Sequence, residues 1–114
     1  MKQLWIMVAG PYNSGAKNDT DRKENLDGLN RIGYEIFQKG HIPIIGVNMA
    51  LPIIDLVGKE KFDELMMPIS LAAAKKCDAV IRVGGESKGA DQELELIRSN
   101  GGTLFNSVDD IPKI

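Results

Sequence analysis

The segment Leu4-Trp5-Ile6-Met7-Val8-Ala9, followed directly by Gly10-Pro11, decides the fold of this chain. A short apolar run that ends at glycine and proline is typical of a strand buried on both faces of a sheet. Three later segments, residues 42–46, 79–83 and 103–105, are further strand candidates. Between the candidates, apolar residues recur at helical spacing over about 20–39, 62–75 and 88–100.

Strands that alternate with helices imply a parallel sheet with right-handed crossovers and helices on both faces. We therefore expect one α/β domain over residues 1–114, a three-layer Rossmann- or flavodoxin-like sandwich with strand order 2-1-3-4. Pro43 places the second strand at an edge, because proline cannot donate a hydrogen bond to a ladder. Residues 48–57 are ambiguous and could hold a short helix, and a polar tail follows residue 105.

The composition narrows the class of protein. With 43 % hydrophobic and 26 % charged residues, the 114-residue chain falls in the range of globular domains, which excludes a disordered, collagen-like or coiled-coil protein. A formal net charge of −2 argues against nucleic acid as the main partner. No apolar stretch approaches the roughly 20 residues that span a bilayer. The start lacks the pattern of a signal peptide, so we expect a cytoplasmic protein without a membrane partner.

The chain has one cysteine, Cys77, and one histidine, His41. They permit neither an intramolecular disulfide nor a Cys/His zinc site, so we expect no metal and no cofactor. His41 is interpreted as a turn residue before the second strand, and Asp78 as the entry residue of the third. Met66 and Met67 are most simply core residues.

Glu93 conflicts with the pattern around it. The last helix has a continuous apolar arc formed by Ala90, Leu94, Leu96 and Ile97, and Glu93 falls between the last two. A buried carboxylate costs several kcal/mol unless it is paired, hydrogen-bonded or protonated, and such conflicts often mark functional sites. Two ordinary explanations stay open: a favourable interaction with the helix dipole near the helix start, or a place at the rim of the apolar face.

Ligands of parallel sheets bind at the carboxyl ends of the strands, where the winding reverses, here between the first and third strands. This places residues 10–12 and 84–90 at the candidate site. The segment 84–89, GGESKG, supplies glycine and serine at a strand-to-helix junction that suits an anion. It is neither a P-loop nor a dinucleotide fingerprint, and the sequence alone favours an ordinary turn with Ser87 as helix cap.

Several segments, taken in order, resemble the nucleoside 2-deoxyribosyltransferase superfamily, which includes small nucleotide N-glycosidases. They are the strand ending in AGPY at 9–12, the helix leading into GHIP at 40–43, the strand entry CDAVI at 77–81, and SKGADQE at 87–93. The last matches the family pattern Ser-x-Gly-(x)3-Glu, and the resemblance covers most of the chain.

The resemblance implies that Glu93 is the nucleophile of a retaining glycosyl transfer, cleaving the N-glycosidic bond of a nucleoside or nucleoside 5′-monophosphate. Tyr12 is expected beside the nucleophile, orienting its carboxylate. Gly10 and Pro11 are expected to contact substrate.

The remaining substrate contacts also follow from the resemblance. Ser87 and Gly89 are expected to hold a 5′-phosphate or 5′-hydroxyl group. In a homodimer or higher homo-oligomer, Asn106 and Ser107 of a neighbouring subunit are the candidates expected to complete the pocket.

One position departs from the family pattern. Where family members carry an aspartate that serves the leaving base, this chain has Ser70, which is expected to bind substrate by a hydrogen bond to the base but is a far poorer proton source. A nucleotide-binding module without efficient catalysis is therefore the alternative function. A flavodoxin-like signalling domain is a third hypothesis, but the chain lacks the expected acidic pair after the first strand.

Overall fold

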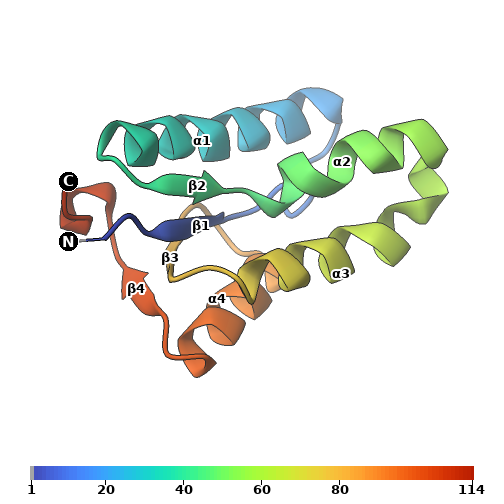
Figure 1. Cartoon of the computed structure of the whole chain (residues 1–114). Coiled ribbons are helices and arrows are strands. Elements are labelled where there is room, and N and C mark those ends of the chain that lie inside the picture. The colour runs from blue at the N-terminus through green and yellow to red at the C-terminus, as the bar shows by residue number, and fades with distance from the viewer. Residues whose placement is uncertain (1) are drawn as a thin grey trace.

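The computed structural model describes residues 2–114 and shows four parallel strands in one sheet, ordered β2-β1-β3-β4 (Figure 1). The strands are β1 (Trp5–Ala9), β2 (Ile42–Ile44), β3 (Ala79–Arg82) and β4 (Thr103–Phe105). The predicted α/β class and strand order are both confirmed. Pro43 lies in β2 at the edge of the sheet, as its missing N–H group suggested.

The helices cover both faces of this sheet. They are α1 (Asp19–Gln38), α2 (Gly46–Val57), α3 (Phe62–Ala74) and α4 (Lys88–Ser99), with single 3-10 turns η1 (Lys59–Lys61) and η2 (Val108–Asp110). The ambiguous segment is thus a helix, and it starts earlier than expected. The prediction that the second strand extends to residue 46 was wrong, because β2 stops at Ile44 and α2 begins at Gly46.

The side chains of β1 alternate between the two faces of the sheet, and helices pack on each face to give three layers. Ile6 and Val8 pack with α1 on one face of the sheet, whereas Met7 and Ala9 pack on the other face with residues of α3 and α4. All four side chains are at most 2 % exposed. A central strand buried on both faces explains why its sequence shows an apolar run instead of alternation.

Helices α2 and α3 form a hairpin that reaches beyond the sheet (Figure 1). Ala50 and Ile54 of α2 pack against Met66 of α3 in a small core of their own. This apolar contact accounts for an α2 helix that contains Pro52. The hairpin contributes to the elongated outline of the molecule, 42 × 26 × 24 Å.

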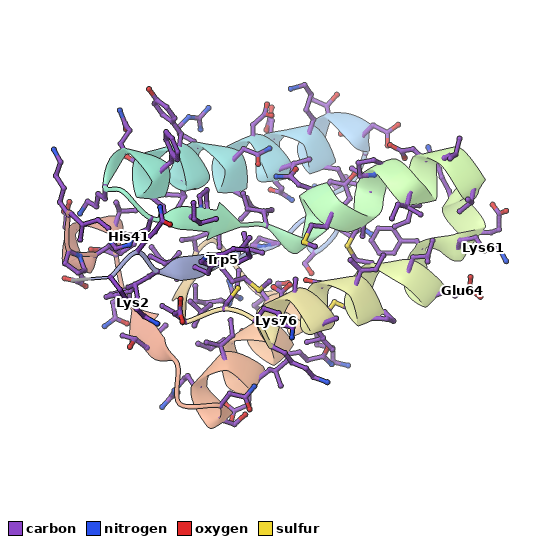
Figure 2. All side chains as sticks on the ribbon, viewed as in Figure 1. Lys2, Trp5, His41, Lys61, Glu64 and Lys76 are labelled. Carbon is purple, nitrogen blue, oxygen red and sulfur yellow. The ribbon has the colours of Figure 1, made fainter. Side chains whose placement is uncertain are left out.

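The segment after β4 is not simply a polar tail. Ile111 is 1 % exposed and joins the core beneath α1. His41, fully buried before β2, accepts a hydrogen bond from the Leu4 backbone N–H at Nδ1 and donates one from Nε2 to the Pro112 carbonyl at 2.6 Å. Figure 2 shows His41 near one end of the molecule, with Lys61 and Glu64 at the other.

Lys39 completes the attachment of this last segment. Its ammonium group donates hydrogen bonds to the carbonyls of Val108 and Ile111, and its own carbonyl accepts one from the Ile114 N–H. The turn between α1 and β2 is therefore the anchor of the carboxyl-terminal residues. Among residues 2–114, no helix is both long enough and apolar enough to cross a membrane.

Candidate active site

A cavity of about 290 Å³ lies at the carboxyl ends of β1 and β3, where the sheet topology places a ligand. Among the described residues that line it, Glu93 is the only carboxylate. The lining comes from the loop after β1 and from α2, α3 and α4: Gly10, Tyr12, Asn13, Ser14, Val47, Phe62, Met66, Met67, Ser70, Ser87, Lys88, Gly89, Ala90, Gln92 and Glu93.

Glu93 lies on the buried face of α4 and is only 8 % exposed. Its Oε2 accepts a hydrogen bond from the hydroxyl of Ser70, which comes from α3 and is 2 % exposed. Glu93 is therefore a carboxylate on a buried apolar face, as the sequence indicated. One neutral donor, the Ser70 hydroxyl, offsets part of the cost of burying it. Glu93 is too deeply buried to lie at the rim of the apolar face, which was one of the two ordinary explanations.

The electrostatic setting of Glu93 is that of a destabilised charge. Burial raises the pKa of its carboxyl group, and the Ser70 hydrogen bond and the charge of Arg82 lower it in part. Arg82 ends β3, donates to Asp91 at 3.0 Å and also binds the carbonyls of Val83 and Gly85. The guanidinium group thus fixes the loop that leads into α4 while it acts on Glu93 from a distance.

Tyr12 lines the same cavity, but the hydrogen bond to the Glu93 carboxylate comes from Ser70. The Tyr12 ring stacks on Phe62 with a centroid distance of 6.5 Å. Burial raises the pKa of its phenol, Arg22 lowers it, and Asp55 and Asp19 raise it further. Arg22, Asp55 and Asp19 line a neighbouring cavity of about 500 Å³, and Tyr12 and Phe62 line it as well. Tyr12 is therefore a wall between two cavities.

Packing alone accounts for the glycines at positions 10 and 89. A Cβ on Gly10 would lie 2.7 Å from a methyl group of Leu29 and 2.8 Å from the Val83 carbonyl oxygen. A Cβ on Gly89 would lie 3.0 Å from the sulfur of Met67. Both glycines nevertheless line the cavity, so a contact of either backbone with substrate stays a prediction.

Ser87 is the N-cap of α4, and its hydroxyl oxygen accepts a hydrogen bond from the Ala90 N–H at 3.1 Å. It also lines a second, outer cavity of about 590 Å³, which lies between the loops after β1 and β3. Pro11 lines this outer cavity and not the inner one. The two cavities share Ser14, Ser87 and Lys88, so a ligand longer than the inner cavity would pass over the amino end of α4.

The outer cavity is rich in carboxylates. Asp21, Glu24 and Glu86 line it, opposed there by the ammonium group of Lys88. Lys88 alone among these four also reaches the inner cavity. A single anionic group at the junction would meet Lys88 first, whereas a second one further out would meet the carboxylates.

The sequence interpretation missed part of the site. Met66 and Met67 were expected to be core residues only, yet both line the cavity beside Ser70. Phe62, the first residue of α3, was assigned no role and forms an aromatic wall. Helical periodicity marks a buried helix face but not the point where that face is open to a ligand.

Three other residues lie away from the cavities. Asn106 is exposed after β4 and is not among the residues that line the three cavities. Asp78 accepts a hydrogen bond from the Trp5 N–H at 2.8 Å, which confirms its place at the entry of β3. His41 binds backbone groups at the opposite end of the sheet.

The inner cavity thus brings together Glu93, Ser70, Tyr12 and the amino end of α4, which are four of the features expected at the site. Such a set can place a carboxylate against an electrophilic carbon and hold a polar group a short distance away. Compared with known proteins, this chain matches no family model and no curated protein.

Proposed function

We propose that the protein is a retaining N-glycosidase or 2-deoxyribosyltransferase that acts on a nucleoside or nucleoside 5′-monophosphate, similar to the nucleoside 2-deoxyribosyltransferase superfamily. The observation that carries the proposal is the Glu93 carboxylate, buried in an apolar helix face yet lining a cavity at the ligand-binding edge of the sheet. A purely structural role gives no reason to keep a charge there, because an apolar side chain would cost less to bury.

In the first step, one oxygen of the Glu93 carboxylate forms a bond to the anomeric carbon of the sugar. The bond from that carbon to the base nitrogen breaks, and its electron pair leaves with the base, which takes a proton from water. The product is a sugar ester of Glu93. Burial favours this step, because a poorly solvated carboxylate loses little hydration when it becomes a neutral ester.

In the second step, water or the nitrogen of another base attacks the same carbon from the face that the first base left. The ester bond breaks, Glu93 recovers its electron pair as a carboxylate, and the attacking group loses a proton to solvent. Two inversions at one carbon give overall retention of configuration. Water as acceptor makes the protein a hydrolase, and a base as acceptor makes it a transferase.

The amino end of α4 is the proposed seat of the 5′ group. Ser87 caps the helix with its hydroxyl oxygen and keeps its own proton free to donate. The helix dipole and the neighbouring Lys88 favour an anion at this position. This supports a nucleoside 5′-monophosphate as substrate in preference to the parent nucleoside.

A binding module without efficient catalysis is the second candidate, and one observation favours it. The only hydroxyl proton of Ser70 is donated to Glu93, so Ser70 has none left for a leaving base. Nor does another carboxyl group among the described lining residues stand in for the aspartate of the resembled family. Binding without release of free base would select this function.

The test is a panel of nucleosides and nucleoside monophosphates, with released base measured by chromatography for the wild type and for Glu93→Gln. Glutamine keeps the shape of the side chain and accepts the Ser70 hydrogen bond but cannot act as the nucleophile. We expect base release to fall by at least about a thousandfold. Release at the wild-type rate would remove Glu93 from the proposed role.

The proposal includes a homodimer in which a neighbouring subunit closes the cavity with Asn106. Two features support an added wall: the cavity is shallow enough to leave Asn13 and Ser14 exposed, and Asn106 is itself exposed at the carboxyl end of β4. Two-fold symmetry would complete both cavities at once.

A further inference from the structure

Helix α2 begins against the Ser70–Glu93 pair. Gly46, its first residue, is buried, and a Cβ added there would overlap the Ser70 hydroxyl, lie 2.6 Å from the Ser70 Cβ and lie 3.2 Å from Glu93 Oε2. Contacts under 3.0 Å require something to shift. The absence of a side chain at this position therefore sets how closely α2 approaches the carboxylate.

The amino end of α2 has no cap from its own flanking sequence. The N-cap residue is Ile45, which provides no side-chain hydrogen bond to the first turn. An uncapped amino end carries a partial positive charge that favours a nearby anion, and the effect is confined to the first turn. Gly46 is the first residue of that turn, so the Glu93 carboxylate lies beside the turn in which the effect is concentrated.

We propose that Gly46 is a positioning residue for Glu93: by lacking a side chain it lets the amino end of α2 close onto the Ser70–Glu93 pair, where the helix favours the ionised carboxylate. The inference rests on the proposed function only in that ionised Glu93 is the nucleophile. The proposed function uses residues of α3 and α4, and this inference adds a residue of a third helix, α2.

Other groups also act on the Glu93 charge. Arg82, at the end of β3, lowers the pKa of Glu93. Tyr12 and Lys88 line the same cavity from the loop after β1 and the start of α4. The Glu93 charge in turn raises the pKa of Cys77, after α3. None of them belongs to α2. A change made at Gly46 therefore separates the contribution of α2 from theirs, and the same change made in a Ser70→Gly background separates it from that of Ser70.

The test follows the Glu93 carboxyl carbon by NMR in ¹³C-labelled protein as the pH is changed, with Glu93→Gln identifying the resonance. Because the readout is a titration, it requires no turnover. In Gly46→Ala we expect the measured pKa of Glu93 to rise by about half a unit to one unit, since the added methyl group forces α2 or Ser70 away. An unchanged titration in the folded variant would overturn the inference.

Gly28→Ala is the matched control, because a Cβ on this α1 glycine has no neighbour within 4 Å. It should leave the Glu93 titration as in the wild type. An equal rise in both glycine variants would also overturn the inference, since the effect would then not depend on contact with the carboxylate.

A second pair covers the case in which Gly46→Ala does not fold. Ser70→Gly removes both of the closest contacts, so the next nearest atom is Glu93 Oε2 at 3.2 Å. We expect Gly46→Ala combined with Ser70→Gly to fold and to show a higher Glu93 pKa than Ser70→Gly alone. Equal values would overturn the inference. If these shifts appear while the wild type releases no base, the proposed function fails and the positioning role of Gly46 stands.

Discussion

The hydroxyl of Ser70 donates a hydrogen bond to the carboxylate of Glu93, joining α3 to α4 beneath the candidate active site. The two residues are 23 positions apart and both are almost fully buried. One neutral donor offsets only part of the cost of burying a carboxylate, so the pair retains a charge that the fold would be more stable without. Such a cost is expected where a side chain is kept for its chemistry.

Replacing Glu93 by glutamine should stabilise the protein at neutral pH. Because burial raises the pKa of Glu93 above its value in the unfolded chain, the unfolded state loses this proton first, and stability falls as the pH rises between the two values. Well below the ordinary pKa of a glutamate carboxyl both states are protonated and the penalty is absent. Thermal unfolding should show Glu93→Gln melting several degrees above wild type at pH 7. A lower melting temperature would contradict a destabilised charge.

Removing the Ser70 hydroxyl should shift the pH dependence of base release. The hydrogen bond from Ser70 lowers the pKa of Glu93, so Ser70→Ala raises it, and the acidic limb of kcat/KM should move up by about one unit. Ser99→Ala is the matched control, because Ser99 lies on the exposed face of α4 and binds only the Leu96 carbonyl. The interpretation fails if both variants give the same profile.

A nucleoside 5′-monophosphate should bind roughly tenfold more tightly than its nucleoside, a difference of about 1.4 kcal/mol. The amino end of α4 and Lys88 favour one phosphate group, and Glu24 and Glu86 in the outer cavity oppose a second. The diphosphate should therefore bind no better than the monophosphate. Calorimetric titration of matched ligands measures both steps. Equal affinity for nucleoside and monophosphate would return Ser87 to the role of a helix cap.

Lys88→Gln tests the charge in this arrangement. The variant should lose part of the preference for the monophosphate and leave nucleoside affinity nearly unchanged. Lys17→Gln, an exposed lysine in the loop before α1 that is not among the residues lining the cavities described above, is the matched control. Raising the salt concentration should weaken monophosphate binding more than nucleoside binding.

His41 should be important for stability and irrelevant to turnover. His41→Ala leaves the Leu4 N–H and the Pro112 carbonyl without their partners and opens a void in a fully buried site. We expect a loss of about 2–4 kcal/mol in the free energy of unfolding. Chemical denaturation measures it. At a temperature where the variant is folded, kcat/KM should equal that of the wild type, and a selective loss of kcat would place His41 in the site.

Mixing two inactive variants tests whether Asn106 completes the cavity of a neighbouring subunit. In a dimer, a chain with Glu93→Gln can lend its Asn106 to a chain with Asn106→Ala, which restores one of the two sites. After exchange at equal concentrations, about a quarter of wild-type activity should return, because half of the dimers are mixed. Light scattering on the same samples reports the assembly. Activity that never rises above the sum of the parent variants would contradict a shared site.

The sequence was sufficient for the architecture because the central strands β1 and β3 are buried on both faces and the helices on one. The apolar run of β1 and the spacing of α1 and α4 follow directly from those environments. Glu93 was found by the same logic, as a charge that contradicts its surroundings. Each of these patterns lies within one segment, so it can be recognised without knowing what that segment contacts.

The contacts that complete the site are not local. Nothing in α3 alone indicates that Ser70 meets Glu93, and a glycine after β2 says nothing of the helix pair it will touch. The start of α2 was also misplaced, because Ile44, Ile45 and Gly46 continue an apolar run that suits a strand equally well. The docking of the last residues was missed for a related reason: Lys39 and His41 bind backbone carbonyls there, which every residue possesses.

The turn at residues 39–41 holds both ends of the described chain, since it receives the N–H groups of Leu4 and Ile114. Both ends therefore leave the domain together, at the side of the sheet away from the cavity (Figure 1). A reporter domain, affinity tag or surface linker fused at either end would begin far from Glu93. The ends could also be joined by a short linker and the chain reopened at Gly58, which would cut the α2–α3 hairpin at its tip while leaving its apolar core and the sheet intact.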